Sequence, residues 1–245
     1  IEIDALGGET IEVAVAETLP GEYGPAPPGP RRLSCDGPLA CAQLFRYVAR
    51  PGRQRFEKFE WTSVKYMMIV VRDAPNGIHL LHAGSVAVTY PAQPIGRFTC
   101  SDELLNRLWD VGCYTLLQCT HDAWEDCPSR EKRQWIGDGI VHYVVSAASY
   151  GPGMQAIDRQ FFLHGVESQR PDGLLQMFAP GDHHIDGVLI PDFNLHFICA
   201  AEQYLLHSGD EETIEYIFPA IQRALQWFAR QIGPNGLLVD LPYWH

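Results

Sequence analysis

The sequence predicts a β-sandwich domain over residues 1–95, followed by an all-helical domain over residues 96–245. Before the boundary, apolar and polar residues alternate in short runs, which is the period of a half-buried strand. From Ser101 onward, apolar residues recur at three- and four-residue spacing, which is the period of an amphipathic helix. Several short strands with regularly spaced turns between them are typical of a sandwich.

Turn residues divide the first domain into short strands. Gly7-Gly8 and Pro75-Asn76-Gly77 are turn sequences, and the Pro- and Gly-rich stretch 21–30 predicts a loop. The runs between them are rich in alternating apolar residues. We therefore expect strands at residues 1–3, 10–15, 46–48, 55–61, 65–71 and 79–90.

Five helices are predicted in the second domain. Ser101 is a suitable N-cap, with Asp102 and Glu103 in the first turn. Short connections at 151–152 and 208–210 alternate with a long one at 169–191. This alternation fits helical hairpins packed in a ring and also an ordinary helical bundle, and periodicity alone does not distinguish them. The helices are expected at about 101–116, 138–149, 153–168, 192–207 and 211–232.

Composition excludes several classes of partner. The formal net charge of −12 argues against nucleic acid and favours a neutral ligand without phosphate. No apolar run approaches the roughly 18 residues of a membrane helix. The first residues lack the basic region and apolar core of a signal peptide. Because the chain begins in mid-strand without Met, we expect the true N-terminus to be absent, and the sequence leaves the compartment open.

Cysteines and histidines predict neither a disulfide framework nor a metal centre. The seven cysteines are odd in number and scattered, and no pair has the CxxC spacing of a zinc site. His183-His184 lies close to Asp186, but adjacent residues rarely bind one ion together. We therefore expect a loop histidine pair without metal, and no cofactor.

Segment 126–138 carries most of the functional information. It is too short, and too interrupted by Pro and Gly, to be a buried helix, and charge in a loop between packed elements usually marks binding or catalysis. Acid-catalysed cleavage of a sugar bond requires carboxyls that exchange protons, carboxylates that bind hydroxyls and an aromatic face for the ring. The segment supplies these groups in Asp126, Arg130, Glu131, Arg133, Trp135 and Asp138.

This segment resembles the signature of bacterial α-L-rhamnosidases of glycoside hydrolase family 78. Asp126-Cys-Pro-Ser-Arg-Glu131 matches the family pattern Asp-Cys-Pro-x-Arg-Glu/Asp, and Trp135-Ile-Gly-Asp138 is similar to Trp-Thr-Gly-Asp. The likeness extends to residues 59–66, 96–109, 209–210 and 227–228. Two departures are Ile136 in place of Thr and residues 132–134 in place of Arg-Leu-Gly. Neither alters a carboxylate, so they concern substrate detail more than chemistry.

The resemblance implies a six-hairpin (α/α)6 barrel behind the sandwich and inverting hydrolysis of terminal α-L-rhamnose. By this likeness Glu131 matches the general acid, and Asp126 and Asp138 match carboxylates that hold sugar hydroxyls. Arg130 matches a residue at the sugar site, and Trp135 looks like part of the pocket wall. Asp192, at a helix start, is added as a candidate substrate-binding residue. The expected ligand is a rhamnose-containing glycoside.

Such a barrel needs about twelve helices, so we expect this chain to hold only about its first half. In the family the general base lies in a later part of the barrel, and no residue here is assigned that role. We therefore expect the chain alone to be inactive. We also expect it to associate with the rest of its polypeptide or with a second copy.

Each candidate also has a purely structural interpretation. Asp138 and Asp192 would serve as N-caps, Asp126 as a turn former, Glu131 as a surface ion-pair partner and Trp135 as core. Two other functions also remain open. One is a non-catalytic carbohydrate-binding or scaffold protein that has lost the base, and the other is a different inverting exo-glycosidase on the same fold.

Overall fold

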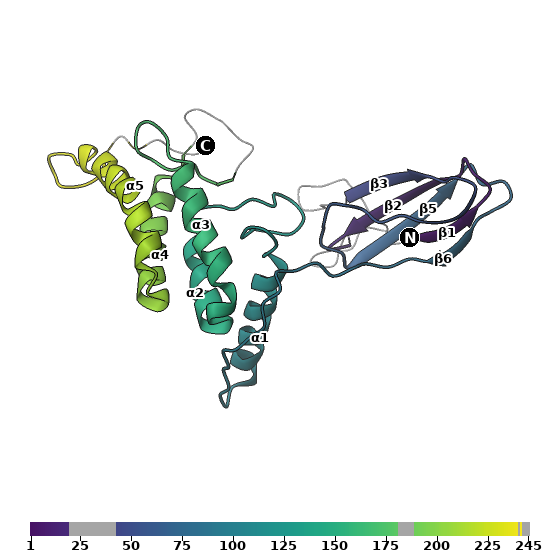
Figure 1. Ribbon diagram of the computed structural model, residues 1–245, viewed down its shortest axis with the longest axis horizontal. Helices are drawn as coiled ribbons and strands as arrows, with labels where there is room; N and C mark the ends of the chain where they lie inside the picture. The colour runs from purple at the N-terminus through teal and green to yellow at the C-terminus, as the bar shows by residue number, and fades with distance from the viewer. Residues whose placement is uncertain (20–42, 181–188, 240, 242–245) are drawn as a thin grey trace. The chain divides into compact units, whose positions relative to one another are not determined.

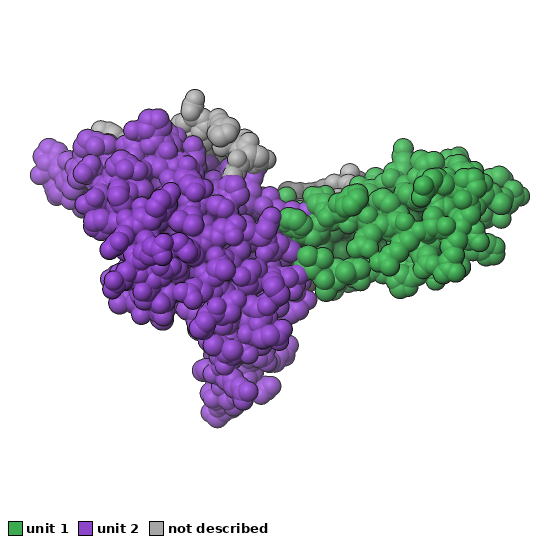
Figure 2. Space-filling model, in the orientation of Figure 1, with its two compact units in different colours: residues 1–88, 128–130 green, residues 89–127, 131–245 purple. Residues whose placement is uncertain are grey.

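A computed structural model describes residues 1–19, 43–180, 189–239 and 241. The chain divides into two compact units. One contains residues 1–88 with 128–130, and the other contains residues 89–127 with 131–245 (Figure 2). Three residues of the signature segment, Pro128 to Arg130, therefore belong to the first unit, whereas the remainder belongs to the second.

The first unit is built from two three-stranded antiparallel sheets (Figure 1). In one sheet the strand order is β4-β1-β6, and in the other it is β3-β2-β5. The strands are β1 (Glu2–Ala5), β2 (Thr10–Ala16), β3 (Gln43–Val48), β4 (Gly52–Arg55), β5 (Tyr66–Arg72) and β6 (His79–His82). The central strand β2 pairs along its length, so that Val13 lies opposite Phe45 on one side and Ile69 on the other.

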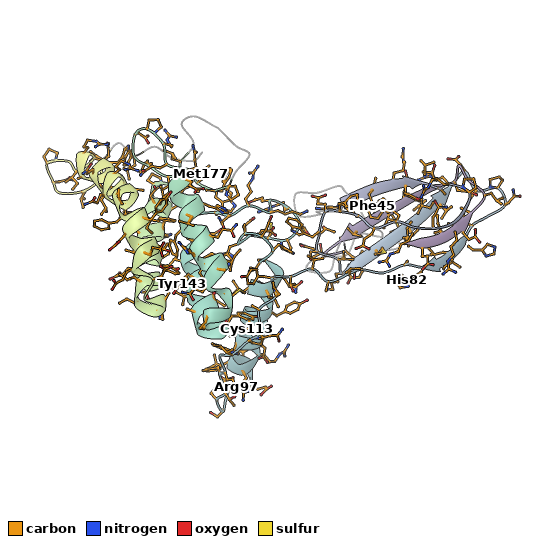
Figure 3. The ribbon with its side chains drawn as sticks, in the orientation of Figure 1. Phe45, His82, Arg97, Cys113, Tyr143 and Met177 are labelled. Atoms are coloured by element: carbon orange, nitrogen blue, oxygen red, sulfur yellow. The ribbon has the colours of Figure 1, made fainter. Side chains whose placement is uncertain are left out.

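The two sheets share one apolar core. Ile3 of β1 and Ile11, Val13 and Val15 of β2 are buried in a single cluster. Phe45, labelled on β3 in Figure 3, packs against the same cluster. Alternate residues of a strand point to one face, and the cluster accordingly takes every second residue of β2, although Glu12 and Ala14 between them are buried as well.

Two strand predictions were wrong in their bounds. The strand predicted at 55–61 shares only Arg55 with β4, which covers Gly52–Arg55, and Phe59 beyond it is fully exposed. The strand predicted at 79–90 ends at His82. In both segments the alternating sequence pattern extends beyond the last residue that pairs with a neighbouring strand.

All five predicted helices are confirmed. They are α1 (Glu103–Gln118), α2 (Gly139–Ser149), α3 (Gln155–Glu167), α4 (Pro191–Ser208) and α5 (Glu211–Arg230), with a 3-10 turn at Gly151–Met154. The predicted cap at Ser101 was wrong by one residue. Asp102 is the N-cap, and its carboxylate accepts a hydrogen bond of 2.8 Å from the Leu104 N–H. Carboxylate caps satisfy backbone donors that a helix leaves unpaired.

The helices contact their neighbours in the chain and also helices two positions away. Helix α2 contacts α4, and α3 contacts α5, so that helices two apart in the chain lie side by side (Figure 1). Between them lies an aromatic core that includes Tyr143 of α2 (labelled in Figure 3), Phe161 and Phe162 of α3, and Tyr204 of α4. Successive contacts of this kind are those of stacked helical hairpins. Among the described residues, no helix combines the length and apolar character needed to cross a bilayer.

Candidate active site

The signature segment joins the end of α1 to the start of α2, and its central loop is closed by one residue pair. The Asp126 N–H donates to the Arg133 carbonyl at 3.0 Å, and the Arg133 N–H donates to Asp126 Oδ1 at 3.0 Å. The first bond joins two backbone groups, and the second adds the Asp126 carboxylate. Asp126 therefore does organise a turn, as one interpretation predicted, while its carboxylate stays half-buried beside the loop.

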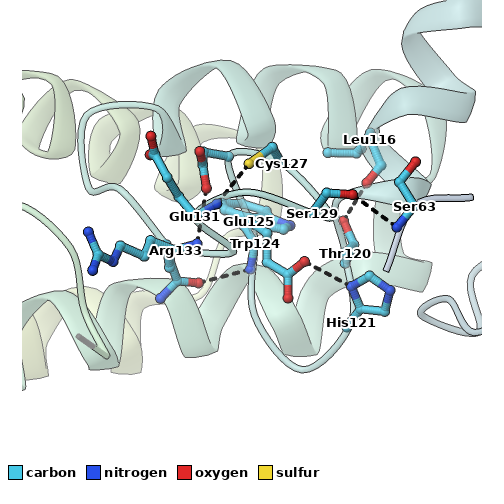
Figure 4. Close-up of polar contacts among 12 residues, drawn as sticks. Ser63, Leu116, Thr120, His121, Trp124, Glu125, Cys127, Ser129, Glu131 and Arg133 are labelled. Carbon is cyan, nitrogen blue, oxygen red and sulfur yellow. Dashed lines mark hydrogen bonds and ion pairs between the residues drawn. The ribbon is translucent and has the colours of Figure 1, made fainter. Parts of the chain in front are cut away.

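Glu131 lies inside this loop and is held at both its backbone and its side chain. Its N–H donates to Cys127 Sγ at 3.3 Å (Figure 4), and its Oε2 accepts a bond of 3.1 Å from Trp135 Nε1. The next residue, Lys132, has a left-handed backbone with φ of 52°. That conformation costs a non-glycine residue on the order of 1–3 kcal/mol and is concentrated at functional sites.

Trp135 is anchored by a short pairing with residues 177–179. The Ile136 N–H donates to the Met177 carbonyl at 2.9 Å, and the Ala179 N–H donates to the Gln134 carbonyl at 3.0 Å. The indole lies edge-on to Phe178, with ring centroids 5.0 Å apart. These contacts fix the orientation of Trp135 from a segment more than forty residues further along the chain.

Asp138 occupies the N-cap position of α2 but does not act as a cap. Its backbone is helical, and its side chain makes no capping hydrogen bond. Burial raises the pKa of its carboxyl, and nearby Asp126 raises it further, whereas His142 and His196 lower it. Asp126 and Asp138 are therefore close enough to interact, and the interpretation of Asp138 as a plain N-cap was wrong.

Asp192 lies in the first turn of α4, where the helix dipole favours a carboxylate, and it is exposed. It is not the N-cap, because Ile190 holds that position. Its neighbour Phe193 lies edge-on to Trp135, with centroids 6.0 Å apart. A Cβ atom on Gly137 would come within 2.2 Å of the Phe193 ring. The start of α4 thus packs directly on the second half of the signature.

Comparison with known proteins places the chain in a family. A family model described as the bacterial α-L-rhamnosidase 6 hairpin glycosidase domain matches residues 93–242. The chain belongs to this rhamnosidase family. An α-L-rhamnosidase of Formosa agariphila is 25% identical across 95% of the chain, which spans only 25% of that protein's length. The resemblance predicted from the signature residues is confirmed.

Solved structures of rhamnosidases share the fold of this chain. A family 78 rhamnosidase of Bacillus sp. GL1 matches 100% of this chain and 24% of its own, with a TM-score of 0.79 and 26% identity. A Klebsiella oxytoca rhamnosidase with rhamnose bound matches 99% of this chain and 46% of its own. Its TM-score is 0.71 at 18% identity, which supports the fold alone.

The two remaining predicted residues of the rhamnosidase site lie on different units. Arg130 is exposed and falls in the first unit, where its neighbour Ser129 accepts hydrogen bonds from Gln43 Nε2 at 2.9 Å and from the Ser63 N–H at 3.1 Å (Figure 4). Asp192, within the described residues, makes no hydrogen bond to the signature. Glu131 and Trp135 are joined by a hydrogen bond, and Asp138 is close enough to Asp126 for the Asp126 charge to raise its pKa.

Sequence reasoning missed Gln134, which is buried beneath the rhamnosidase signature. Its Oε1 accepts from the Trp124 N–H at 3.0 Å, and its Nε2 donates to the Ala179 carbonyl and lies 3.3 Å from His164 Nδ1. The available signal was its position, because an uncharged polar residue stands there between Arg133 and an apolar run.

A second group outside the predicted site residues is the buried pair of His121 and Glu125. Nδ1 of His121 lies 3.1 Å from Oε2 of Glu125 (Figure 4). The Glu125 carbonyl lies 3.2 Å from His142 Nε2. His142 also stacks on Trp124, with centroids 5.6 Å apart. The pair therefore connects the end of α1 to the first turn of α2, which follows directly on Asp138.

No cluster of three potential metal ligands occurs among the residues that the structure describes. The histidine pair at 183–184 and nearby Asp186 lie outside the described residues. The five described cysteines are all free thiols, namely Cys100, Cys113, Cys119, Cys127 and Cys199.

Proposed function

We propose that this chain carries the acid-bearing site of a glycoside hydrolase that removes terminal non-reducing α-L-rhamnose with inversion. Glu131 is the general acid, and Asp126 and Asp138 bind sugar hydroxyls. The supporting observation is the hydrogen bond from the Trp135 indole to the Glu131 carboxyl, in a segment where the charge of Asp126 also raises the pKa of Asp138. The family match over residues 93–242 includes this whole segment.

Asp138 is suited to accept hydroxyl hydrogen bonds. Its carboxylate is half-buried, and among the described residues no side-chain or backbone donor is bonded to it. A carboxylate in that position gains a charge-assisted bond when a sugar hydroxyl replaces water. Arg130 and Asp192 are further residues that we propose for sugar binding.

Inversion requires two carboxyls on opposite faces of the sugar. Glu131 would protonate the leaving oxygen, while a base about 6.5–9.5 Å away would deprotonate the attacking water. We assign no residue of this chain to the base. The proposed ligand is a neutral deoxy-sugar, in keeping with the net charge of −12 and with the rhamnose bound in the Klebsiella oxytoca rhamnosidase.

Ligand class is tested by saturation-transfer NMR of the chain with L-rhamnose, glucose and a mononucleotide. We expect saturable binding of L-rhamnose, weakened about tenfold in Asp138→Asn through loss of a charge-assisted bond. Asp110→Asn is the control, because Asp110 is an exposed aspartate on α1. Preference for the nucleotide would contradict the proposal.

The role of Glu131 is tested by turnover. In an intact enzyme that also supplies the general base, Glu131→Gln should abolish hydrolysis of a rhamnosyl disaccharide, whose leaving group needs a proton, and should affect an activated aryl rhamnoside much less. Near-wild-type rates of the variant on the disaccharide would exclude the assignment. An intact protein that contains this chain, binds L-rhamnose and hydrolyses no rhamnoside would favour the non-catalytic carbohydrate-binding alternative instead.

A further inference from the structure

Trp135 has little surface with which to stack on a sugar. The residue is 9% exposed. Phe178 and Phe193 approach it edge-on at 71° and 88°, and Met177 completes the cluster. Carbohydrate platforms need an open aromatic face. The burial of this indole therefore points to a role other than stacking.

The polar atom of Trp135 is committed to the carboxyl of Glu131. Nε1 donates to Oε2 at 3.1 Å, from a residue four positions further along the chain. A hydrogen bond to a carboxylate is stronger and more directional than one between neutral groups. Such a bond restricts rotation about the last torsion of the glutamate side chain, which is otherwise broad.

The indole itself is immobilised by its neighbours in the chain. Gln134 and Ile136 flank it, and both are bonded to the backbone of segment 177–179. The Gln134 side chain adds bonds to Trp124 and Ala179. The donor thus stands on a rigid support, which is what accurate placement of a catalytic group requires.

We propose that Trp135 is a positioning residue for Glu131, which directs the carboxyl toward the glycosidic oxygen rather than binding the sugar ring. This inference rests on the proposed role of Glu131 as the acid. In this role the functional group of the tryptophan is its indole N–H and not its ring face. Phenylalanine at this position would keep the packing with Phe178 and Phe193 but would lack the donor.

The test compares Trp135→Phe with Trp227→Phe. Trp227 is also 9% exposed and lies in a separate apolar cluster with Leu174 and Phe228, so it is a matched control for ring replacement. In ¹H–¹⁵N spectra of the chain, the indole signal that disappears in Trp135→Phe should shift in Glu131→Gln. The ¹³C carboxyl signal of Glu131 should move in Trp135→Phe and stay in place in Trp227→Phe.

Kinetics separate positioning from sugar binding. In an intact enzyme that also supplies the general base, we expect Trp135→Phe to lower kcat on rhamnosides with poor leaving groups by about 10²-fold, as misplacement of a reacting group does. KM and L-rhamnose affinity should change little, and activated aryl rhamnosides should lose much less rate.

Two results would overturn the inference. One is an indole signal that does not move in Glu131→Gln, and the other is a Trp135→Phe variant with weakened L-rhamnose binding and unchanged kcat. Absence of L-rhamnose binding in the wild-type chain would instead overturn the proposed function. The two failures are distinguishable, because the indole and carboxyl signals report the contact between Trp135 and Glu131 in the absence of ligand.

Discussion

The carboxyls of Asp138 and Asp158 in the helical unit have different surroundings, and the effect of each on the pKa can be measured. Asp138 lies near one carboxylate and two imidazoles. Asp158 of α3 is buried, with Ser146 Oγ donating to it at 2.9 Å. The first environment bears on ligand binding and the second on stability, so they lead to separate predictions.

The pKa of Asp138 should respond to its neighbours with opposite signs. Because the Asp126 carboxylate raises it and His196 lowers it, Asp126→Asn should lower the pKa of Asp138, and His196→Ala should raise it. A ¹³C titration of the side-chain carboxyl measures both shifts. Asp192→Asn, which changes an exposed aspartate on the same helix as His196, should leave the titration in place. Shifts of equal sign in the first two variants would contradict the assigned neighbours.

Asp158 should make the chain less stable as pH rises. Burial raises the pKa of its carboxyl from 3.8 to about 7, so the folded state holds the proton more tightly than the unfolded state. Its contribution to the free energy of unfolding is full below about pH 4 and is lost as pH rises through about 7, by up to about 4 kcal/mol.

Asp158→Asn should remove that slope, since the amide stays neutral and still accepts the Ser146 bond. Urea unfolding at pH 4.5 and pH 8 measures the difference, with Asp110→Asn as the exposed control. A variant whose stability falls between these pH values as steeply as that of the wild type would show that another group is responsible.

At the scale of elements, helices were predictable and strand ends were not. Three- and four-residue spacing located α1 to α5, because an amphipathic face repeats over several turns. The strand predicted at 79–90 ends at His82 in the structure. Alternation of apolar and polar residues shows which face a side chain would take, but it does not show whether a partner strand is present. Gln134 was missed for a related reason, because its partners Trp124 and Ala179 meet it only after the chain has folded.

Helix packing makes two glycines differ sharply in their tolerance of a methyl group. A Cβ atom at Gly139 of α2 would come within 2.0 Å of the Phe161 ring, whereas nothing lies within 4 Å of one at Gly112 of α1. Gly139→Ala should therefore destabilise the chain by about 1–3 kcal/mol through overpacking. Gly112→Ala should stabilise it by about 0.5–1 kcal/mol through helix propensity. Urea midpoints of the two variants should move in opposite directions.

At the scale of the whole molecule, the outer side of α1 is unusually apolar. Leu104, Leu108, Val111 and Tyr114 are 63%, 57%, 57% and 65% exposed, and Leu116 is the one buried residue of this helix. Exposed apolar patches of this kind mark interaction surfaces or aggregation sites. The prediction from sequence that the chain associates therefore has a specific surface to test.

Leu104→Glu with Leu108→Glu should reduce self-association and the binding of the dye ANS. Size-exclusion chromatography across a range of concentrations measures the first effect. Leu44→Glu with Val48→Glu, at two exposed positions of β3 in the other unit, is the control for two added charges alone. Equal behaviour of the two variants would show that net charge, and not the face of α1, governs association.

The Phe193 ring beneath Gly137 has a consequence for how this signature evolves. The two residues are far apart in the chain, yet the ring occupies the space that any side chain at position 137 would need. They should therefore covary. A homologue that replaces the glycine should have a smaller side chain at position 193. The loss of stability in Gly137→Ala should accordingly be restored by Phe193→Leu. The residue found at position 137 of the signature would then depend partly on packing against α4 and not on catalysis alone.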